Sequence, residues 1–66
     1  MKAIEKAVDI IGTQTNVADI LGVKQASVWN WIHRGRLPAK HIRSVAKATN
    51  HKVSVNELLK DHENNN

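Results

Sequence analysis

The side chains best suited to reading a chemical partner lie close together in the middle of the chain. Gln25, Ala26, Trp29 and Asn30 recur at the three- and four-residue spacings that place side chains on one face of a helix. Gln and Asn can each form a bidentate pair with adenine in the major groove of DNA, and Ala can contact a thymine methyl group. Trp29 has two open interpretations, because an indole here can contact sugar or thymine methyl groups or pack against another protein chain.

Around this group the charges are of one sign. No Asp or Glu occurs between Ile20 and Asn56, a stretch that we call the acid-free segment. Its basic residues are Lys24, Arg34, Arg36, Lys40, Arg43, Lys47 and Lys52, and the six acids all lie outside it: Glu5, Asp9, Asp19, Glu57, Asp61 and Glu63. A block of one sign indicates a polyanionic partner, either a nucleic acid or an anionic membrane.

Five helices are predicted to position these residues, which makes the expected fold class all-α. Apolar periodicity and stop signals place the first four at about residues 2–11, 14–21, 25–34 and 38–49. Gly12, Gly22 and Gly35 suit helix ends, and Pro38 suits a first turn. In the third helix, Val28 and Trp31 belong to the stripe that we expect to face the core.

The last region allows two interpretations. Ser54 and Glu57 have the spacing of a capping box, which predicts a short final helix. Val53 and Val55 alternate with polar residues, so a short strand competes with that helix over residues 51–59. We expect one domain over residues 1–60 and a disordered polar tail over residues 61–66.

The segment from Gln14 to Val28 has the pattern of two helices that cross steeply. Ala18 is small enough for a close crossing, and Gly22 can make the sharp turn between the helices. Val23 and Val28 would then hold the crossing from inside. This arrangement leaves the outer face of the second helix exposed, and such a helix fits the major groove of DNA.

Other kinds of chemistry find little support in the residues. The four His residues lack Cys partners and the paired spacing of zinc ligands, and no Cys occurs, so we expect no metal site. Ser27, Ser44 and Ser54 with His41 do not suggest a hydrolase, and 66 residues leave little room for an enclosed active site. We therefore expect no enzyme and no cofactor.

The apolar runs are too short for a membrane span, and the amino terminus does not have the form of a signal peptide. The absence of Cys fits a location in the reducing cytoplasm. Of the two polyanionic partners, DNA is the stronger expectation, because the acid-free segment occurs together with the pattern of two steeply crossing helices.

These motifs resemble those of Cro-like phage repressors and of prophage regulators of the YdaS kind. Residues 12–23 look like their first motif helix and turn, and residues 25–32 look like their recognition helix. Residues 35–38 are similar to the usual exit into the fourth helix, and residues 53–58 resemble the family's carboxyl-terminal pattern. The resemblance covers about residues 3–60 and implies a lambda-repressor-like helix-turn-helix domain.

The family's roles carry over to matching positions. Gln25 resembles the leading base-reading residue, with Ala26, Trp29 and Asn30 beside it. The residues expected to contact phosphate are Thr13, Gln14, Lys24, Ser27, His33, Arg34, Arg36, Lys40 and Arg43. Trp29 departs from the family's pattern, in which a polar or smaller residue is usual, and Lys24 departs from the Ser, Thr or Asp that would cap the third helix better.

The resemblance implies a sequence-specific transcriptional repressor that binds a double-stranded DNA operator as a homodimer. A dimer contact through Val53, Val55 or the final helix is one hypothesis. Two other functions stay open: an antitoxin-type or activating prophage regulator, and a protein-interaction module that binds an acidic partner through Trp29 and the basic face.

Overall fold

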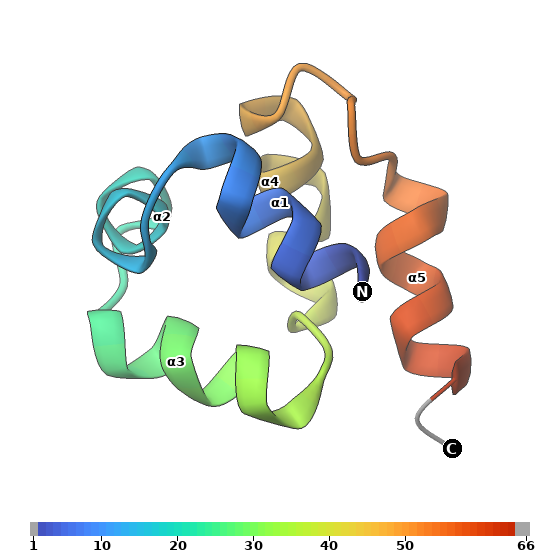
Figure 1. The fold of residues 1–66 in the computed structure, drawn as a ribbon, viewed down its shortest axis with the longest axis horizontal. Helices are drawn as coiled ribbons and strands as arrows, with labels where there is room; N and C mark the ends of the chain where they lie inside the picture. Colours follow the sequence, from blue (N-terminus) through green and yellow to red (C-terminus); the bar gives the residue numbers. More distant parts are fainter. Residues whose placement is uncertain (1, 65–66) are drawn as a thin grey trace.

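The computed structural model describes residues 2–64 as a bundle of helices without strands in that range (Figure 1). The elements in chain order are α1 (Ala3–Ile11), α2 (Gln14–Leu21), α3 (Gln25–Arg34), a 3₁₀ turn η1 (Ala39–His41), α4 (Ile42–Ala48) and α5 (Val55–Asn64). The five α-helices of the sequence prediction are thus confirmed. The predicted fourth helix is divided, because its first turn is η1 and regular α-helix begins only at Ile42.

The core lies where the apolar stripes of all five helices meet. Its buried residues are Ile4, Ala7, Val17, Ala18, Val28, Trp31, Leu37, Ile42, Val45, Ala46, Val53 and Leu58. Leu37 and Val53 are in connecting segments and yet have 1% and 0% of their surface exposed. The connection before η1 and the connection after α4 are therefore each held to the core by one apolar side chain.

The start of α2 and the ends of α2 and α3 follow local rules. The Thr13 hydroxyl accepts from the backbone N–H of Asn16 at 3.1 Å, which caps α2. Gly22 and Gly35 end α2 and α3 in the left-handed conformation, with φ of 69° and 79°, which Gly adopts without the steric cost of a Cβ.

The carboxyl-terminal region is helical, which settles the choice between strand and helix for residues 55–59. The Ser54 hydroxyl accepts from the Glu57 N–H at 3.1 Å, as the capping box predicts. Just before it, the buried Thr49 hydroxyl donates to the Ala46 carbonyl at 2.8 Å and accepts from the Val53 N–H at 3.2 Å. Thr49 thereby satisfies the polar groups of the α4–α5 connection while Val53 enters the core.

The expected tail at residues 61–66 is wrong for residues 61–64, and residues 65–66 lie outside the described range. α5 continues to Asn64, and only 4% of the Asp61 surface is exposed. The Asp61 carboxylate accepts from the backbone N–H groups of Ala3 at 3.2 Å and Ile4 at 3.0 Å. The amino terminus of α1 is thus capped by a side chain from the other end of the chain, which composition alone could not indicate.

Candidate nucleic-acid interface

α3 presents two chemically distinct faces. Val28 is fully buried and Trp31 is 9% exposed, so this stripe faces the core as the sequence predicted. Gln25, Ala26 and Asn30 are exposed. Both the inward and the outward side of α3 are therefore as the residue spacing predicts.

The turn between α2 and α3 sets the angle of the outward face. Gly22 follows α2, and the Val23 N–H donates to the Ala18 carbonyl at 3.0 Å, which closes the turn. Ala18 is 3% exposed, so its small side chain lies inside the crossing. Figure 1 shows α2 almost end-on while α3 runs across the view, so the two helices cross at a steep angle. This is the helix-turn-helix arrangement.

The predicted phosphate-contacting residues at the helix starts differ in their accessibility. Thr13 and Lys24 are exposed, whereas Gln14 and Ser27 are partly buried. Lys24 makes no side-chain hydrogen bond to the start of α3, which agrees with its interpretation as a poor cap. Its ammonium group is therefore not engaged in holding the helix end.

Gln14 lies in a hollow between α1, α2 and α3, beside Glu5, Asp9, Val8 and Ile32. The carboxylates of Glu5 and Asp9 repel a phosphate group. The amino-terminal end of α2 is therefore less favourable for phosphate than the sequence suggested. The acids of α1 could be placed near Gln14 only by the tertiary structure.

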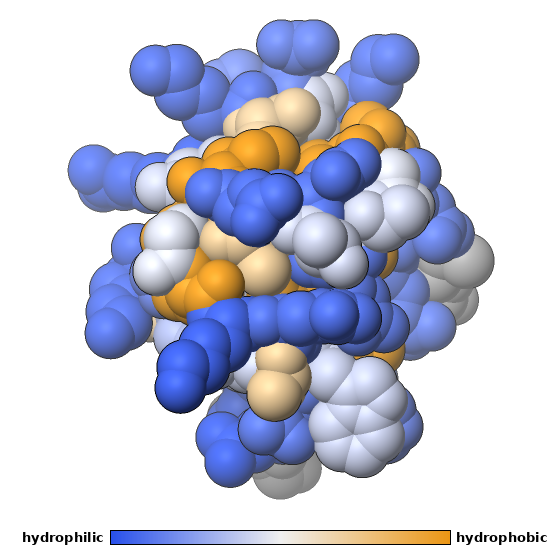
Figure 2. All heavy atoms as spheres, turned by 90° about the vertical axis from the view of Figure 1, so that its left-hand side faces the viewer, coloured by the Kyte–Doolittle hydropathy of each residue, from blue (hydrophilic) through white to orange (hydrophobic). Residues whose placement is uncertain are grey.

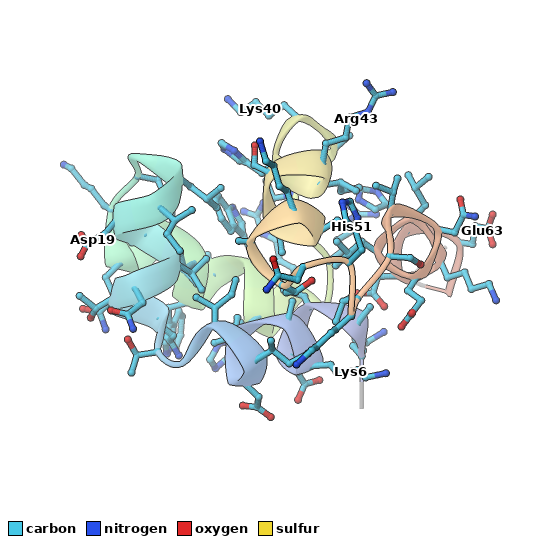
Figure 3. The ribbon with its side chains drawn as sticks, turned by 90° about the horizontal axis from the view of Figure 1, so that it is seen from above. Lys6, Asp19, Lys40, Arg43, His51 and Glu63 are labelled. Atoms are coloured by element: carbon cyan, nitrogen blue, oxygen red, sulfur yellow. The ribbon has the colours of Figure 1, made fainter. Side chains whose placement is uncertain are left out.

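The cations of the acid-free segment are available to a ligand. Arg34, Arg36, Lys40 and Arg43 are all exposed, and no ion pair joins any basic residue of this segment to a carboxylate in residues 2–64. In Figure 3, Lys40 and Arg43 point to the same side of the molecule, opposite the edge where Lys6 of α1 lies. Lys40 and Arg43 are thus gathered on one side of the molecule.

The turn after α3 collects further groups that the sequence did not connect. A hollow there is lined by Trp31, Arg34, Arg36, Leu37, Pro38 and His62. The His62 ring lies 2.6 Å from the Leu37 carbonyl, measured from Nε2, and so ties the end of α5 to this turn. His62 was expected in the polar tail, and its contact here was not predicted, because no local signal links residue 62 to residue 37.

His33 was predicted to contact phosphate, and the structure gives it a neighbour on its own helix. Its imidazole stacks on the Trp29 indole, with ring centroids 3.6 Å apart and planes 28° from parallel. Its Nδ1 lies 3.0 Å from the Trp29 carbonyl oxygen. His33 and Trp29 therefore act as one aromatic pair on the outward side of α3.

The surfaces of α2, α4 and α5 combine polar and apolar side chains. Figure 2, which shows the side of α2, has hydrophilic side chains with apolar patches between them. Ile20 on α2 is 55% exposed and lines a hollow with Ser44, Lys47 and Ala48 of α4. Val53 is fully buried, so the hypothesis that it forms a dimer contact is wrong for this fold, whereas Leu59 of α5 is 43% exposed.

A metal-binding cluster and a membrane-spanning helix are both absent from residues 2–64, the part of the chain that the structure describes. Three or more His, Asp or Glu side chains do not gather there in an arrangement that could hold a metal ion. The helices in this range also lack the length and apolar character required to span a membrane.

Comparison with known proteins agrees with the fold and the motif. The solved structure of the Cro protein from putative prophage element Xfaso 1 in Xylella fastidiosa strain Ann-1 is 38% identical in sequence. The two structures match over 92% of this chain and 94% of the Cro chain, with a TM-score of 0.85. A search of curated proteins found no match.

Residues 4–66 match the model of the family described as "Bacterial toxin YdaS". The match extends over nearly the whole chain and includes all the helices described above. Together with the similarity to the prophage Cro protein, it confirms the resemblance inferred from the motifs. The chain belongs to the YdaS family and has the helix-turn-helix fold of a Cro-like prophage regulator.

Proposed function

We propose that this protein is a transcriptional repressor that binds a specific operator in double-stranded DNA. One observation carries the proposal: α3 exposes Gln25, Ala26 and Asn30 while Val28 and Trp31 bury its opposite side. A helix of this kind, held outward by a second helix, is suited to the major groove.

The basic residues supply the affinity in this proposal. Arg34, Arg36, Lys40 and Arg43 contact phosphates, with Lys24, Thr13 and Ser27 at the helix starts and Gln14 at a partly buried position. Phosphate contacts set the register on the duplex but do not select a sequence. Selection comes from Gln25 and Asn30, which pair with base edges, and from Ala26 and Trp29, which contact apolar groups.

Two protomers bind together in this mechanism. Two-fold related recognition helices enter successive major grooves about 34 Å apart, so the operator is palindromic. The dimer covers promoter DNA and blocks transcription sterically. Such a protein acts in the bacterial cytoplasm, on the nucleoid.

Selection of bound duplexes from random DNA tests the proposal. A palindromic consensus supports it, and recovery of no common sequence contradicts it. On the selected operator, Gln25→Ala and Asn30→Ala should reduce discrimination against altered base pairs by about 1–3 kcal/mol each. Arg36→Ala should weaken specific and non-specific duplexes alike. Operator preference that survives both amide substitutions would refute the assignment of α3.

A second candidate is a protein-interaction module that binds an acidic partner. The exposure of Trp29 and Ile20, at 49% and 55%, favours it. Salt titration of duplex binding separates the two, because phosphate contacts make the logarithm of the affinity fall steeply and linearly with the logarithm of the salt concentration. An antitoxin-type or activating regulator would bind DNA through the same face and would differ in its effect on transcription from the operator.

A further inference from the structure

The outward face of α3 contains one large apolar group among polar neighbours. The Trp29 side chain belongs to a residue that is 49% exposed, and Gln25 and Asn30 beside it are exposed as well. An indole at such a place, without a neighbour to hold it, exchanges between rotamers. A ligand must then immobilise the ring at an entropic cost when it binds.

Trp29 has such a neighbour. The His33 imidazole lies one turn further along α3 and covers one side of the indole at a centroid distance of 3.6 Å. The Nδ1 atom of His33 is 3.0 Å from the Trp29 backbone carbonyl. A carbonyl oxygen can only accept, so Nδ1 must carry the hydrogen of this bond. The imidazole is thus held by its edge to the backbone and by its face to the indole.

This geometry changes the role expected of His33. With Nδ1 bonded to the backbone, the imidazole is fixed on the helix, and Nε2 is the ring nitrogen left for another partner. The ring is then a fixed surface against which the indole packs. The distances thus describe a contact of His33 with Trp29.

We propose that His33 is a positioning residue that holds the Trp29 indole in place to read the 5-methyl group of a thymine in the major groove. The inference rests on the proposed function and deepens it. An apolar side chain distinguishes thymine through this methyl group, which is the one apolar feature of base edges in the major groove. An indole held in advance makes that contact without the cost of ordering the ring.

Replacement of thymine by uracil tests the inference, since it removes only the methyl group. Each thymine of the selected operator is replaced in turn, and the ratio of affinities for the two duplexes is measured. The wild-type protein should lose about two- to tenfold in affinity at one thymine per half-site, the range expected when an apolar contact or the order of one side chain is lost. Trp29→Ala should abolish the loss at that position.

Three variants of His33 separate its possible roles. His33→Phe keeps a ring against the indole and should retain the thymine-to-uracil ratio. His33→Ala and His33→Gln remove the ring and should bring the ratio toward one. Arg34→Ala, the adjacent exposed cation, is the matched control and should weaken both duplexes equally.

A spectroscopic measurement on the free protein completes the test. Wild-type protein should give contacts between the Trp29 and His33 rings by nuclear magnetic resonance and a single Trp29 χ1 rotamer, and His33→Ala should give averaged rotamers. Averaged rotamers in the wild type would overturn the inference. So would a thymine-to-uracil ratio that is the same for His33→Ala and wild type on an operator that binds specifically. If no duplex binds specifically, the proposed function fails and this inference fails with it, whereas a ratio unchanged in His33→Ala refutes the inference alone.

Discussion

The outward face of α3 and the junction of α1 with α5 are held together in different ways. On α3, the interactions of Trp29 and His33 span four residues of one helix. At the junction, Asp61 reaches Ala3 and Ile4, which are 58 and 57 residues away in the chain. The junction uses long-range bonds to close the domain, while the face of α3 is left free of such bonds and remains available to a ligand.

This difference implies that the two regions can be altered separately. Substitutions at the junction should lower the free energy of unfolding and affect DNA binding only through the folded fraction. Substitutions of exposed residues on α3 and around α4 should change binding and leave the unfolding free energy within about 0.5 kcal/mol. Each of the following predictions tests one side of this separation.

The largest effect is expected from loss of core volume in α5. Leu58 is fully buried, and Leu58→Ala should reduce the unfolding free energy by about 3 kcal/mol, because it removes apolar contacts and leaves a cavity. Urea denaturation measures the change. Leu59→Ala is the matched control, since Leu59 is 43% exposed and should contribute less than about 1 kcal/mol. Equal losses for both leucines would contradict the packing of α5.

The second effect is expected from the cap on α1. Asp61→Ala leaves the N–H groups of Ala3 and Ile4 without the carboxylate and should cost about 2 kcal/mol of unfolding free energy. Thermal denaturation with circular dichroism detects this loss. Glu63→Ala, an exposed acid on the same helix, should change stability by less than about 0.5 kcal/mol. A stability of Asp61→Ala equal to that of Glu63→Ala would show that the cap contributes nothing.

A smaller effect, on binding alone, is expected at η1, the turn before α4. Lys40→Ala should weaken operator binding by about 1 kcal/mol and reduce the slope of log affinity against log salt by about 0.9, which corresponds to one phosphate contact. Fluorescence anisotropy at several salt concentrations gives both values. Lys60→Ala removes the same charge from α5, outside the acid-free segment, and should leave the slope unchanged. An identical slope for Lys40→Ala and wild type would remove Lys40 from the interface.

The smallest effect is expected from the surface ion pair at the junction. The Lys6 ammonium and a Glu57 carboxylate oxygen are 3.6 Å apart, with side chains 53% and 43% exposed. Water and salt screen such a pair, so Lys6→Ala should change stability by less than about 0.5 kcal/mol. A double-mutant cycle with Glu57→Ala measures the coupling directly. Coupling above about 1 kcal/mol would mean that the pair, and not only Asp61, fastens α1 to α5.

Predictions from the sequence succeeded where the signal was local. The bounds of α2 and α3 follow from Thr13, Gly22 and Gly35, whose capping roles depend on neighbouring residues only. The outward side of α3 follows from the spacing of Val28 and Trp31. The resemblance to Cro-like and YdaS-type regulators was equally visible in these motifs, and the family match confirms it.

Predictions failed where a residue's role depends on a distant partner. The polar segment after Lys60 suggested a tail, but Asp61 and His62 are held by groups from α1 and from the turn after α3. Val53 suggested a strand or a dimer contact, but its side chain packs into the core to which all five helices contribute. Whether the predicted base and phosphate contacts form stays a prediction.

The sequence by itself determined the number of helices, the bounds of α2 and α3, the steep turn between these two helices and the side of α3 that faces outward, because capping and periodicity act within a few residues of the chain. Only the tertiary structure decided that Asp61 caps α1, that His62 reaches the turn after α3 and that two acids of α1 lie beside Gln14. Those features require segments far apart in the chain to meet. Burial of the shared apolar core brings these segments together. The composition indicates that a core forms, but not which segments of the chain meet in it.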